Sequence, residues 1–401
     1  MNILLVHNFY QQPGGEDQVF ASEADLLARF GHRVQTFTVH NDRLRTMHGA
    51  AAAAAAIWNP ASGAALGRAV REHRAKVVHF HNTFPLISPA GYAAARRQGA
   101  AVVQTLHNFR LLCPNALLFR DGRPCEQCVG RHLAWPGIAH GCYRNSRLAS
   151  AVNAVGAAVH RAMGFWRRLV DVYIALSRFS GARLMAGGLP AQKIVVKPNF
   201  IDPDPGPGTQ DGGYALFAGR LSAEKGVGVL LRAWSELRGP VELKILGDGE
   251  LQDQVRAAAA ADQRIQWLGR RPTEQVQQLV GEARCVVVSS ECYENFPRLI
   301  VEAFARGTPV IASRLGAMAE LVDHEQTGLL FTPGDAADLA RCVQRLWNDP
   351  ALLRSMRAAA RSMYQQRYTG LVNHRMLMDI YQRALRLAGH RSSAAAPAAP
   401  A

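Results

Sequence analysis

The strongest constraint on this chain is the alternation of short apolar runs with longer stretches whose apolar residues recur at helical spacing. Such alternation is typical of parallel α/β architecture, because parallel neighbouring strands need a crossover helix between them. The pattern occurs in both halves of the 401-residue chain, which is too long for one core of ordinary size. The expected strands are Ile3–Val6, Val34–Thr38, Val77–Phe80, Ala101–Thr105 and Val172–Ala175 in the first half, and Tyr214–Ala218, Glu242–Leu246, Ile265–Leu268, Cys285–Ser289 and Pro309–Ala312 in the second.

A stretch rich in proline and glycine, Asn199–Gly208, separates the two halves. This composition suits neither a helix nor a central strand, so it is expected to be a linker. The sequence therefore predicts an N-terminal Rossmann-like domain over 1–200 and a C-terminal one over 209–365. A helix over 366–391 is expected to return to the first domain, and the Ala/Pro/Ser tail 392–401 is expected to be disordered.

The net charge of +15 is carried almost entirely by the first half. Residues 1–200 contain 23 Lys or Arg against 9 Asp or Glu, whereas residues 201–401 contain 23 against 22. Such an excess suits an anionic membrane surface or a phosphate-bearing acceptor, and a merely solvated surface is the alternative. Nucleic acid is not expected as a partner, because no aromatic-interleaved binding motif accompanies the charge.

The sequence favours a cytoplasmic protein. No apolar run reaches the roughly 18 residues of a transmembrane helix. The start, Met1–His7, has neither the basic region nor the small-residue cleavage site of a secretory signal, and instead suits a buried first strand.

In the second half, the expected strand Tyr214–Ala218 leads into a glycine turn that carries Arg220 and Lys225. A turn of this kind before a helix can cradle an anion, because a guanidinium forks onto phosphate oxygens and an ammonium adds a point charge. A solvated loop would have a similar composition. The turn Gly247-Asp-Gly249 follows the next strand, where the backbone is expected to approach a ligand or a neighbouring loop closely.

A further segment places two glutamates around a predicted helix start. The helix is expected to begin near Pro297 and to end at Gly307. Glu294 then lies in the preceding loop, and Glu302 lies about one and a half turns inside the helix. The N–H groups of the helix start favour an anion such as a pyrophosphate. Glu294 can accept hydrogen bonds from sugar hydroxyls and Glu302 can reach a ribose, unless Glu302 faces solvent.

The spacing Glu294-x7-Glu302, followed by Gly-Thr-Pro-Val-Ile, closely resembles the donor-binding signature of family 4 retaining glycosyltransferases of GT-B fold. The resemblance implies two Rossmann-like domains whose parallel sheets face a central cleft. It also implies transfer of a sugar from a nucleotide sugar to a hydroxyl of a lipid-linked or polysaccharide-type acceptor. Nearly the whole chain is covered, through Gly14-Gly15, Thr105-Leu-His107, Lys197-Pro-Asn199 and Gly219-Arg220…Lys225-Gly226.

The resemblance also assigns roles to residues. Arg220 and Lys225 would hold the donor pyrophosphate, and Glu302 the nucleotide ribose. His107 would lie in the cleft against the sugar, and Glu294 would hold the transferred sugar, so these two are the candidate catalytic residues. Gly15 would let the backbone approach the phosphates. The implied donor-binding set is Gly14, Gly15, Asn199, Arg220, Lys225, Asn295, Phe296, Arg298, Leu299 and Glu302.

The chain departs from the family's pattern in one place. The family usually has Gly-Phe-Gly after the first glutamate, whereas this chain has Asn295-Phe296-Pro297, and Pro297 has no amide hydrogen to donate. The resemblance implies that catalysis needs no metal or other cofactor, because the leaving phosphate helps to deprotonate the incoming hydroxyl. Asp202-Pro-Asp204 matches the DxD metal motif of the other glycosyltransferase fold only superficially, since it lies in the linker.

Four cysteines lie in an insert over about 113–142, spaced as Cys113-x11-Cys125-x2-Cys128-x13-Cys142. This spacing is typical of a structural zinc site, and disulfides are not expected in a cytoplasmic chain. Buried inert thiols are the alternative reading.

Beyond the insert, Arg144–Arg183 combines apolar stretches with Trp166, Arg167 and Arg168. Such a segment can lie on an anionic bilayer, with Trp166 as an aromatic anchor beside the two cations, and the alternative is a helix packed on the first domain.

Three other functions compete with the transferase hypothesis. A sugar-nucleotide epimerase of the same fold would turn over its substrate without an acceptor, whereas a glycan phosphorylase would need a pyridoxal-phosphate lysine motif, which is not found. A zinc-containing nucleic-acid-binding protein would use the basic half, but it leaves the Glu294 and Glu302 segment unexplained.

Overall fold

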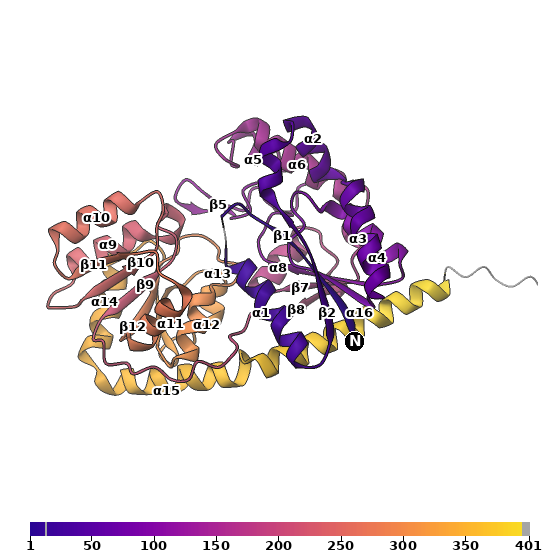
Figure 1. The fold of residues 1–401 in the computed structure, drawn as a ribbon. Coiled ribbons are helices and arrows are strands. Elements are labelled where there is room, and N and C mark those ends of the chain that lie inside the picture. The colour runs from indigo at the N-terminus through magenta and orange to yellow at the C-terminus, as the bar shows by residue number, and fades with distance from the viewer. Residues whose placement is uncertain (13, 395–401) are drawn as a thin grey trace, which may run out of the picture. The chain divides into compact units, whose positions relative to one another are not determined.

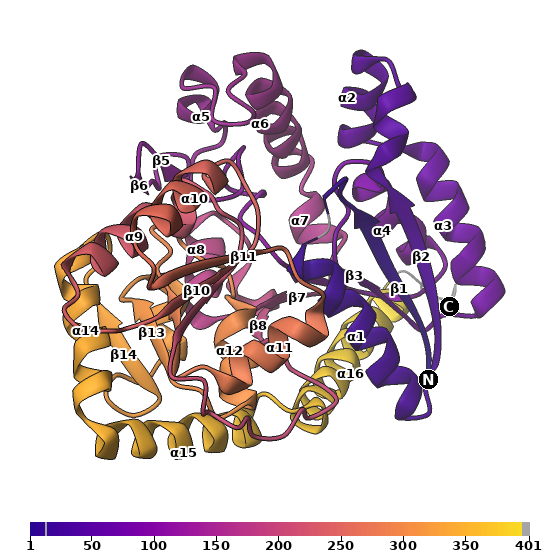
Figure 2. The same cartoon turned by 60° about the vertical axis from the view of Figure 1, so that its left-hand side comes forward.

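The computed structural model describes residues 1–12 and 14–394, with side chains described as far as Arg391. The chain divides into two compact units, each with its own six-stranded sheet (Figures 1 and 2). The α/β architecture expected from the alternating pattern is therefore confirmed. The first unit comprises Met1–Leu117, Glu126–Pro198 and the chain from Asn373, and the second comprises Leu118–Cys125 and Asn199–Val372.

The sheet of the first unit has the strand order β2-β1-β3-β4-β7-β8, and all neighbours are parallel. The five strands expected in this half are present. The edge strand β8 was not predicted, because three residues are too few to show a periodicity. The strands are β1 (Asn2–Phe9), β2 (Arg33–His40), β3 (Val77–Phe80), β4 (Ala101–Leu106), β7 (Val172–Ala175) and β8 (Ile194–Val196), with a separate antiparallel pair β5 (Phe119–Arg120) and β6 (Arg123–Pro124) in the cysteine insert.

The C-terminal helix α16 (Gly370–Ala394) completes the core of the first unit, where Leu377 and Tyr381 pack with Leu27 and with the strands (Figure 1). Of the tail expected to be disordered, the first three residues continue this helix and residues 395–401 lie outside the described residues. The other helices of the unit are α1 (Gly15–Arg29), α2 (Gly49–Ile57), α3 (Pro60–His73), α4 (Ser88–Arg97), α5 (Trp135–Ala139), α6 (Arg147–Ala162), α7 (Phe165–Arg168) and α8 (Arg178–Ala186), with 3-10 turns η1 (Asn41–Thr46) and η2 (Ala191–Lys193).

The sheet of the second unit has the order β11-β10-β9-β12-β13-β14, again with all neighbours parallel. Numbered within the unit, this is the order 3-2-1-4-5-6 of dinucleotide-binding folds. Five of the six strands were predicted, and β14 was missed. The strands are β9 (Ala215–Ala218), β10 (Leu243–Leu246), β11 (Ile265–Gly269), β12 (Cys285–Val288), β13 (Val310–Ser313) and β14 (Gly328–Phe331).

In the second unit, α9 and α14 lie together against the sheet and build the apolar core with it (Figure 2). The helix predicted to begin near Pro297 is α12, with Pro297 as its N-cap, and Gly307 just beyond its end has a φ of +69°. The helices are η3 (Ala223–Lys225), α9 (Val227–Glu236), α10 (Gln252–Ala261), α11 (Thr273–Glu282), α12 (Arg298–Ala305), α13 (Gly316–Leu321), α14 (Ala336–Asn348) and α15 (Pro350–Arg367).

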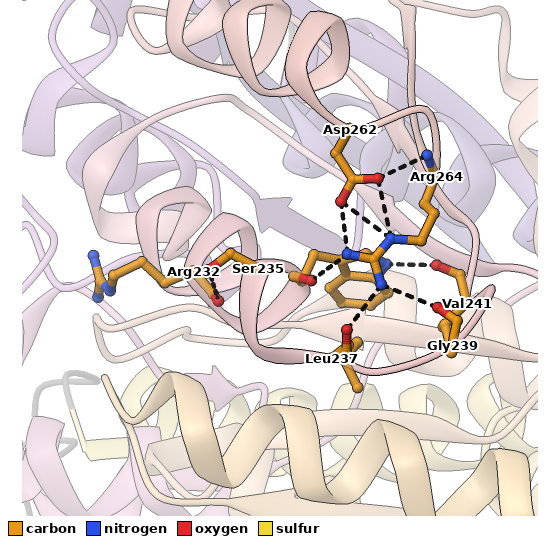
Figure 3. A network of polar contacts seen from close by, with 8 residues as sticks. Arg232, Ser235, Leu237, Gly239, Val241, Asp262 and Arg264 are labelled. Carbon is orange, nitrogen blue, oxygen red and sulfur yellow. Dashed lines mark hydrogen bonds and ion pairs between the residues drawn. The ribbon is translucent and has the colours of Figure 1, made fainter.

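Arg264, just before β11, links the start of this strand to the end of α9 and the loop after it (Figure 3). Its guanidinium donates to both carboxylate oxygens of Asp262 at 2.7–3.1 Å, and to the carbonyls of Trp234, Leu237 and Gly239 at 2.8–3.1 Å. A single side chain thus satisfies the end of α9 and the loop after it. Because the strands are parallel, the start of β11 lies at the edge opposite to the carboxyl ends, where ligands bind in such folds.

Each sheet has one point where the strand order reverses: between β1 and β3 in the first unit, and between β9 and β12 in the second. Ligands of open α/β sheets bind beside the carboxyl ends of the strands at such a point. The topology therefore selects the loops after these four strands. Among the described residues, no helix combines the length and the apolar character needed to cross a membrane.

Candidate functional site

In the second unit, the loops after β9 and β12 bring together the lysine and the first glutamate singled out in the sequence. Lys225 Nζ lies 2.5 Å from Glu294 Oε1, and Ser290 Oγ donates to the same oxygen at 2.7 Å. The side chains of Lys225 and Glu294 are 30% and 14% exposed. The pair is thus half-buried and remains in reach of a ligand.

Electrostatics keep both members of this pair charged. Burial alone would raise the pKa of Glu294, but the charge and hydrogen bond of Lys225, the Ser290 hydroxyl and the charge of Arg220 together lower it below its ordinary value. Burial likewise opposes the charge of Lys225, yet Glu294 raises the pKa of that lysine above its ordinary value. Arg220 itself is exposed, and its influence on Glu294 places it in the same neighbourhood.

Gly226 makes this arrangement possible. Its φ is +69°, and a Cβ there would lie 1.9 Å from the carbonyl oxygen of Ser289. The loops also bond directly, since Ser289 Oγ donates to the Lys225 carbonyl at 3.0 Å and the Glu291 N–H donates to the Glu224 carbonyl at 2.9 Å. Only glycine allows the two loops to approach so closely.

The turn Gly247-Asp-Gly249 approaches a neighbouring loop. A Cβ on Gly247 would lie 1.9 Å from the Gly219 carbonyl oxygen, and one on Gly249 would lie 2.4 Å from that of Leu221. Of the two readings of this turn, the structure supports contact with the β9 loop.

The residues around the start of α12 are mostly buried. Asn295 and Phe296 are each 9% exposed, and the Phe296 ring stands edge-on to Tyr368 with centroids 6.4 Å apart. Within the helix, Arg298 Nη2 lies 3.3 Å from Glu302 Oε1, and both side chains are 16% exposed. Glu302 is therefore partly covered and held by Arg298. The remaining candidates of this unit are Leu299, which is half-buried, and Asn199, which is buried.

In the first unit, His107 follows β4 directly and is half-buried. It borders a pocket with about 880 Å³ of space between atoms, including the solvent at its mouth. The wall from α2 and α6 is partly apolar, because Ala56, Val152 and Ala157 line it together with Asn153 and His160. Polar groups line the pocket near His107, among them Asn108.

Trp166 forms part of this pocket and is only 5% exposed, with the Arg161 guanidinium 5.0 Å from its ring. The sequence reading of Trp166 as an exposed anchor for a membrane is therefore wrong. The physical reason is that the short helix α7 turns its tryptophan inward, whereas Arg167 and Arg168 stay exposed.

The double glycine lies at the start of α1, with Gly14 as N-cap. The Gly14 N–H donates to Asp17 Oδ2 at 2.8 Å, and the other oxygen of Asp17 lies 2.7 Å from His7 Nε2. A Cβ on Gly14 would meet nothing within 4 Å, so the neighbouring protein atoms do not require glycine there.

Glu16 was not singled out from the sequence. Burial, and then the charge of Asp17, raise its pKa to about 8, against the opposing effects of Arg110 and Asn108. Its neighbours Asn108 and Arg110 line the pocket beside His107. No local sequence pattern marks such a carboxyl, because its burial depends on a loop that follows a different strand.

Sequence reasoning also missed His79 and His81, which lie near His107; His81 Nδ1 is 3.1 Å from His107 Nε2. The His-x-His spacing at the end of a strand was the available signal, since residues two apart share one face.

The zinc site stays a prediction. Among the described residues, two groups of side chains bring ligand atoms within 4.8 Å of one another, Glu23–His79–His81 and His7–Glu16–Asp17, and neither contains a cysteine. Cys113 Sγ donates to Asn115 Oδ1 at 2.9 Å, and Cys128 Sγ lies 3.9 Å from the Ala134 carbonyl oxygen. Metal analysis of the purified protein would test the prediction of about one zinc per chain.

Two family models match the chain: "Glycosyltransferase Family 4" over residues 13–205 and "Glycosyl transferases group 1" over residues 212–349. The amylovoran biosynthesis glycosyltransferase AmsK of Erwinia amylovora is 29% identical over 229 residues, which cover 53% of this chain and 56% of that protein. The 2-deoxystreptamine glucosyltransferase of Streptomyces kanamyceticus is 30% identical over 282 residues, or 67% of each chain. The matched region thus spans only about half of AmsK.

Solved structures show the same fold. The Anabaena protein HepE in complex with UDP superposes with a TM-score of 0.68 at 20% identity, over 94% of this chain and 99% of HepE. Sucrose-phosphate synthase from Thermosynechococcus elongatus superposes with a TM-score of 0.72 at 18% identity, over 96% of this chain and all of that one. The chain therefore belongs to the group 1 glycosyl transferases of glycosyltransferase family 4, with the GT-B fold.

Proposed function

We propose that the chain is a retaining glycosyltransferase whose second unit holds a nucleotide-sugar donor and whose first unit holds the acceptor. The observation that carries this proposal is the Lys225–Glu294 pair beside Arg220 at the strand-order reversal of a dinucleotide-type sheet. HepE has been solved with UDP and with UDP-glucose, which makes a UDP-sugar the first donor to test.

The donor chemistry follows from the charges of this pair. A lysine ammonium has three N–H donors, and Glu294 accepts only one of those of Lys225, so two remain for phosphate oxygens. With Arg220, Lys225 would neutralise the pyrophosphate as it leaves, which stabilises the transition state where charge develops. The ionised Glu294 would accept hydrogen bonds from hydroxyls of the transferred sugar.

Transfer with retention of the sugar's anomeric configuration, but without a protein nucleophile, fits the same geometry. Lys225 and Ser290 both donate to Glu294 Oε1, and these two hydrogen bonds draw charge from the carboxylate and reduce its nucleophilicity. We therefore propose that the acceptor hydroxyl enters on the face that the phosphate leaves and gives its proton to that phosphate. His107 would contact the transferred sugar, and no metal ion would be required.

We propose a lipid-linked acceptor of polysaccharide biosynthesis. The pocket beside His107 has a partly apolar wall, and its apolar side chains suit an acceptor with an apolar group better than a free polysaccharide. AmsK is by name an enzyme of amylovoran biosynthesis.

Peripheral contact with an anionic membrane would bring such an acceptor to the enzyme. Leu148, Val155 and Met163 recur at helical spacing on or just after α6 and are 78%, 44% and 56% exposed. Trp135 on the adjacent α5 is 54% exposed and has the Arg131 guanidinium 5.5 Å from its ring. We propose that this apolar and basic surface, Trp135–Leu148–Val155–Met163, takes the place of the Trp166 anchor.

The decisive experiment is a thermal-shift screen against UDP-, GDP-, ADP- and dTDP-sugars, because a ligand that binds only the folded state raises Tm by mass action. One nucleotide sugar is expected to stabilise the protein far more than the others. No stabilisation by any of them would contradict the donor site. Conversion of the donor to an epimer without any acceptor would favour an epimerase instead.

A further inference from the structure

A second, smaller pocket of the first unit adjoins the pocket beside His107. It has about 270 Å³ of space between atoms, including the solvent at its mouth. Four residues line both pockets: Arg110, Leu111, Asn153 and Ala157. A group bound in the smaller pocket therefore lies next to the place proposed for the acceptor.

The smaller pocket is basic. Arg110, Arg131 and Arg161 line it, and none of the described residues that line either pocket is Asp or Glu. In the part of the chain that the structure describes, none of the three guanidiniums forms an ion pair with a carboxylate. Glu16 is close enough for Arg110 to influence its pKa, but burial and the charge of Asp17 raise that pKa to about 8. Glu16 is therefore mostly protonated at pH 7 and leaves the charge of Arg110 uncompensated.

The three guanidiniums are held by neutral groups instead. They donate to backbone carbonyls, which are those of Pro114 for Arg110 at 3.3 Å, of Gln127 for Arg131 at 2.7 Å, and of Arg131 and Gly187 for Arg161, the latter at 2.8 Å. Each also lies over an aromatic ring, with its central carbon 4.4 Å from the centroid of Phe84 for Arg110, 5.5 Å from Trp135 for Arg131 and 5.0 Å from Trp166 for Arg161. These contacts hold the side chains in place without neutralising them, so less conformational entropy is lost when an anion binds.

The smaller pocket also borders the apolar surface Trp135–Leu148–Val155–Met163. Arg131 lines the pocket and lies beside Trp135, which is 54% exposed. The helices α5 and α6 pack together (Figures 1 and 2), and α6 contributes Ala157 to both pockets and Leu148 to the exposed surface. Because the cations lie beside apolar side chains, the site suits an anion attached to an apolar chain better than a free anion.

We infer that Arg110, Arg131 and Arg161 form a subsite for the phosphate that joins the sugar of the acceptor to its apolar chain. This inference rests on the proposed function, since it takes the acceptor to be lipid-linked. Guanidiniums suit this role because their N–H groups fork onto phosphate oxygens. With the phosphate at the arginines, the reacting sugar lies toward His107. The chain then lies along α6, whose apolar side chains partly line the pocket and are partly exposed.

The inference can be tested with geranyl diphosphate, which combines a pyrophosphate with an apolar chain and carries no sugar. Calorimetric titration without membranes or detergent, below the concentration at which the compound forms micelles, measures its affinity. We expect geranyl diphosphate to bind much more tightly than geraniol, which lacks the charge, and than inorganic pyrophosphate, which lacks the chain.

Substitutions of the arginines locate the binding site. Arg110→Gln and Arg131→Gln should each weaken binding of geranyl diphosphate about tenfold, since each removes a hydrogen bond to an ionised group. The lysine variants at the same positions keep the charge and should retain most of the affinity. Arg147→Gln is the matched control, because Arg147 is also exposed and also donates to a carbonyl, that of Ala139 at 3.1 Å, but lines neither pocket.

Binding of the diphosphate at the proposed donor site is excluded by repeating the titrations in a Lys225→Ala background, where the effect of Arg131→Gln should persist. Equal affinity of the wild type and both glutamine variants would overturn the inference, and so would equal binding of geranyl diphosphate and geraniol. Equal binding of geranyl diphosphate and pyrophosphate would show a site for free anions and overturn the lipid assignment. Arg131 is exposed, so Arg131→Gln should fold and decides the matter even if Arg110→Gln does not. None of these results bears on donor binding, which the nucleotide-sugar screen measures separately.

Discussion

Each unit contains a pair of one lysine and one glutamate, and the two pairs are buried to different degrees. In the second unit, Lys225 and Glu294 are 2.5 Å apart and 30% and 14% exposed. In the first, Lys197 and Glu23 are 3.7 Å apart and almost completely sealed. The Lys225–Glu294 pair leaves donors and acceptors for a ligand, whereas the Lys197–Glu23 pair can act only on its protein neighbours.

The pKa values of the two pairs are shifted in opposite directions, which reflects the difference in distance and exposure. The close contact lowers the pKa of Glu294 and raises that of Lys225, although burial opposes both changes. In the sealed pair burial dominates, so the pKa of Glu23 is raised and that of Lys197 is lowered, with each partner opposing the change. Contact distance and access to water, rather than residue types, therefore decide how a Lys–Glu pair behaves.

The largest expected effect is a difference in stability when the lysine of each pair is replaced. Lys197→Met should destabilise the protein by about 3–5 kcal/mol, because it leaves the sealed Glu23 carboxyl without its lysine partner. Lys225→Met should cost much less, because Glu294 is reached by water and keeps the Ser290 hydrogen bond. Urea unfolding of the two variants measures this difference. Equal losses would show that the pairs do not differ as described, and Glu23→Met/Lys197→Met should recover most of the lost stability.

A smaller effect tests the ligand-binding role of the open pair. Lys225→Ala and Glu302→Ala should each weaken binding of the nucleotide sugar tenfold or more, which corresponds to about 1.4 kcal/mol. Calorimetric titration with the donor found in the screen measures the affinity. Lys244→Ala is the matched control in the same unit, since Lys244 packs over the Tyr214 ring 3.7 Å away. Wild-type affinity in both site variants would remove the donor assignment.

Two carboxyl groups, one in each unit, should change the stability of the folded state in opposite directions as the pH rises. The pKa of Glu294 is lowered in the folded state, so its stabilising effect is present at neutral pH and is lost as the pH falls through that pKa. The pKa of Glu16 is raised to about 8, so the folded state favours its protonated form, and stability falls as the pH rises from the ordinary glutamate range through 8.

Thermal unfolding of the two glutamine variants at several pH values measures these changes in stability. Glu294→Gln should lower Tm at pH 7 and have less effect at pH 4. Glu16→Gln should raise Tm relative to the wild type at pH 9 and have little effect at pH 4. A uniform shift of either variant across the pH range would mean that the carboxyl charge is not responsible.

The smallest expected effect concerns membrane binding, which one exposed leucine in each unit allows us to compare. The protein should sediment with anionic liposomes at low salt and leave them as salt is added. Leu148→Ala should reduce this binding severalfold, whereas Leu371→Ala, which removes a 47% exposed leucine of the second unit, should not. Equal sedimentation with neutral vesicles, or equal effects of the two substitutions, would argue against the surface around Trp135 and Leu148.

Sequence patterns were enough to predict an element where a single segment contains both the apolar run and the residues that mark its ends. The strand β12 and helix α12 were predicted because an apolar run is followed by a proline at a helix start and by a glycine beyond its end. The edge strands β8 and β14 were missed, β8 because three residues show no periodicity, and β14 because its run Gly-Leu-Leu-Phe begins with a glycine and contains no β-branched residue. Trp166 was misjudged for a different reason, since the direction of its side chain depends on how α7 packs.

The sequence by itself determined that the chain forms two α/β units, and it supplied Arg220, Lys225, Glu294 and Glu302 as candidates for a nucleotide-sugar site. The alternation of apolar runs and the spacing of charged residues are local properties, which a sequence displays directly. Only the tertiary structure decided which charges meet. Lys225 and Glu294 are 69 residues apart, and Glu23 and Lys197 are 174 apart. Their distances and exposure, and hence their pKa directions, arise only when strands from distant parts of the chain lie side by side and exclude water.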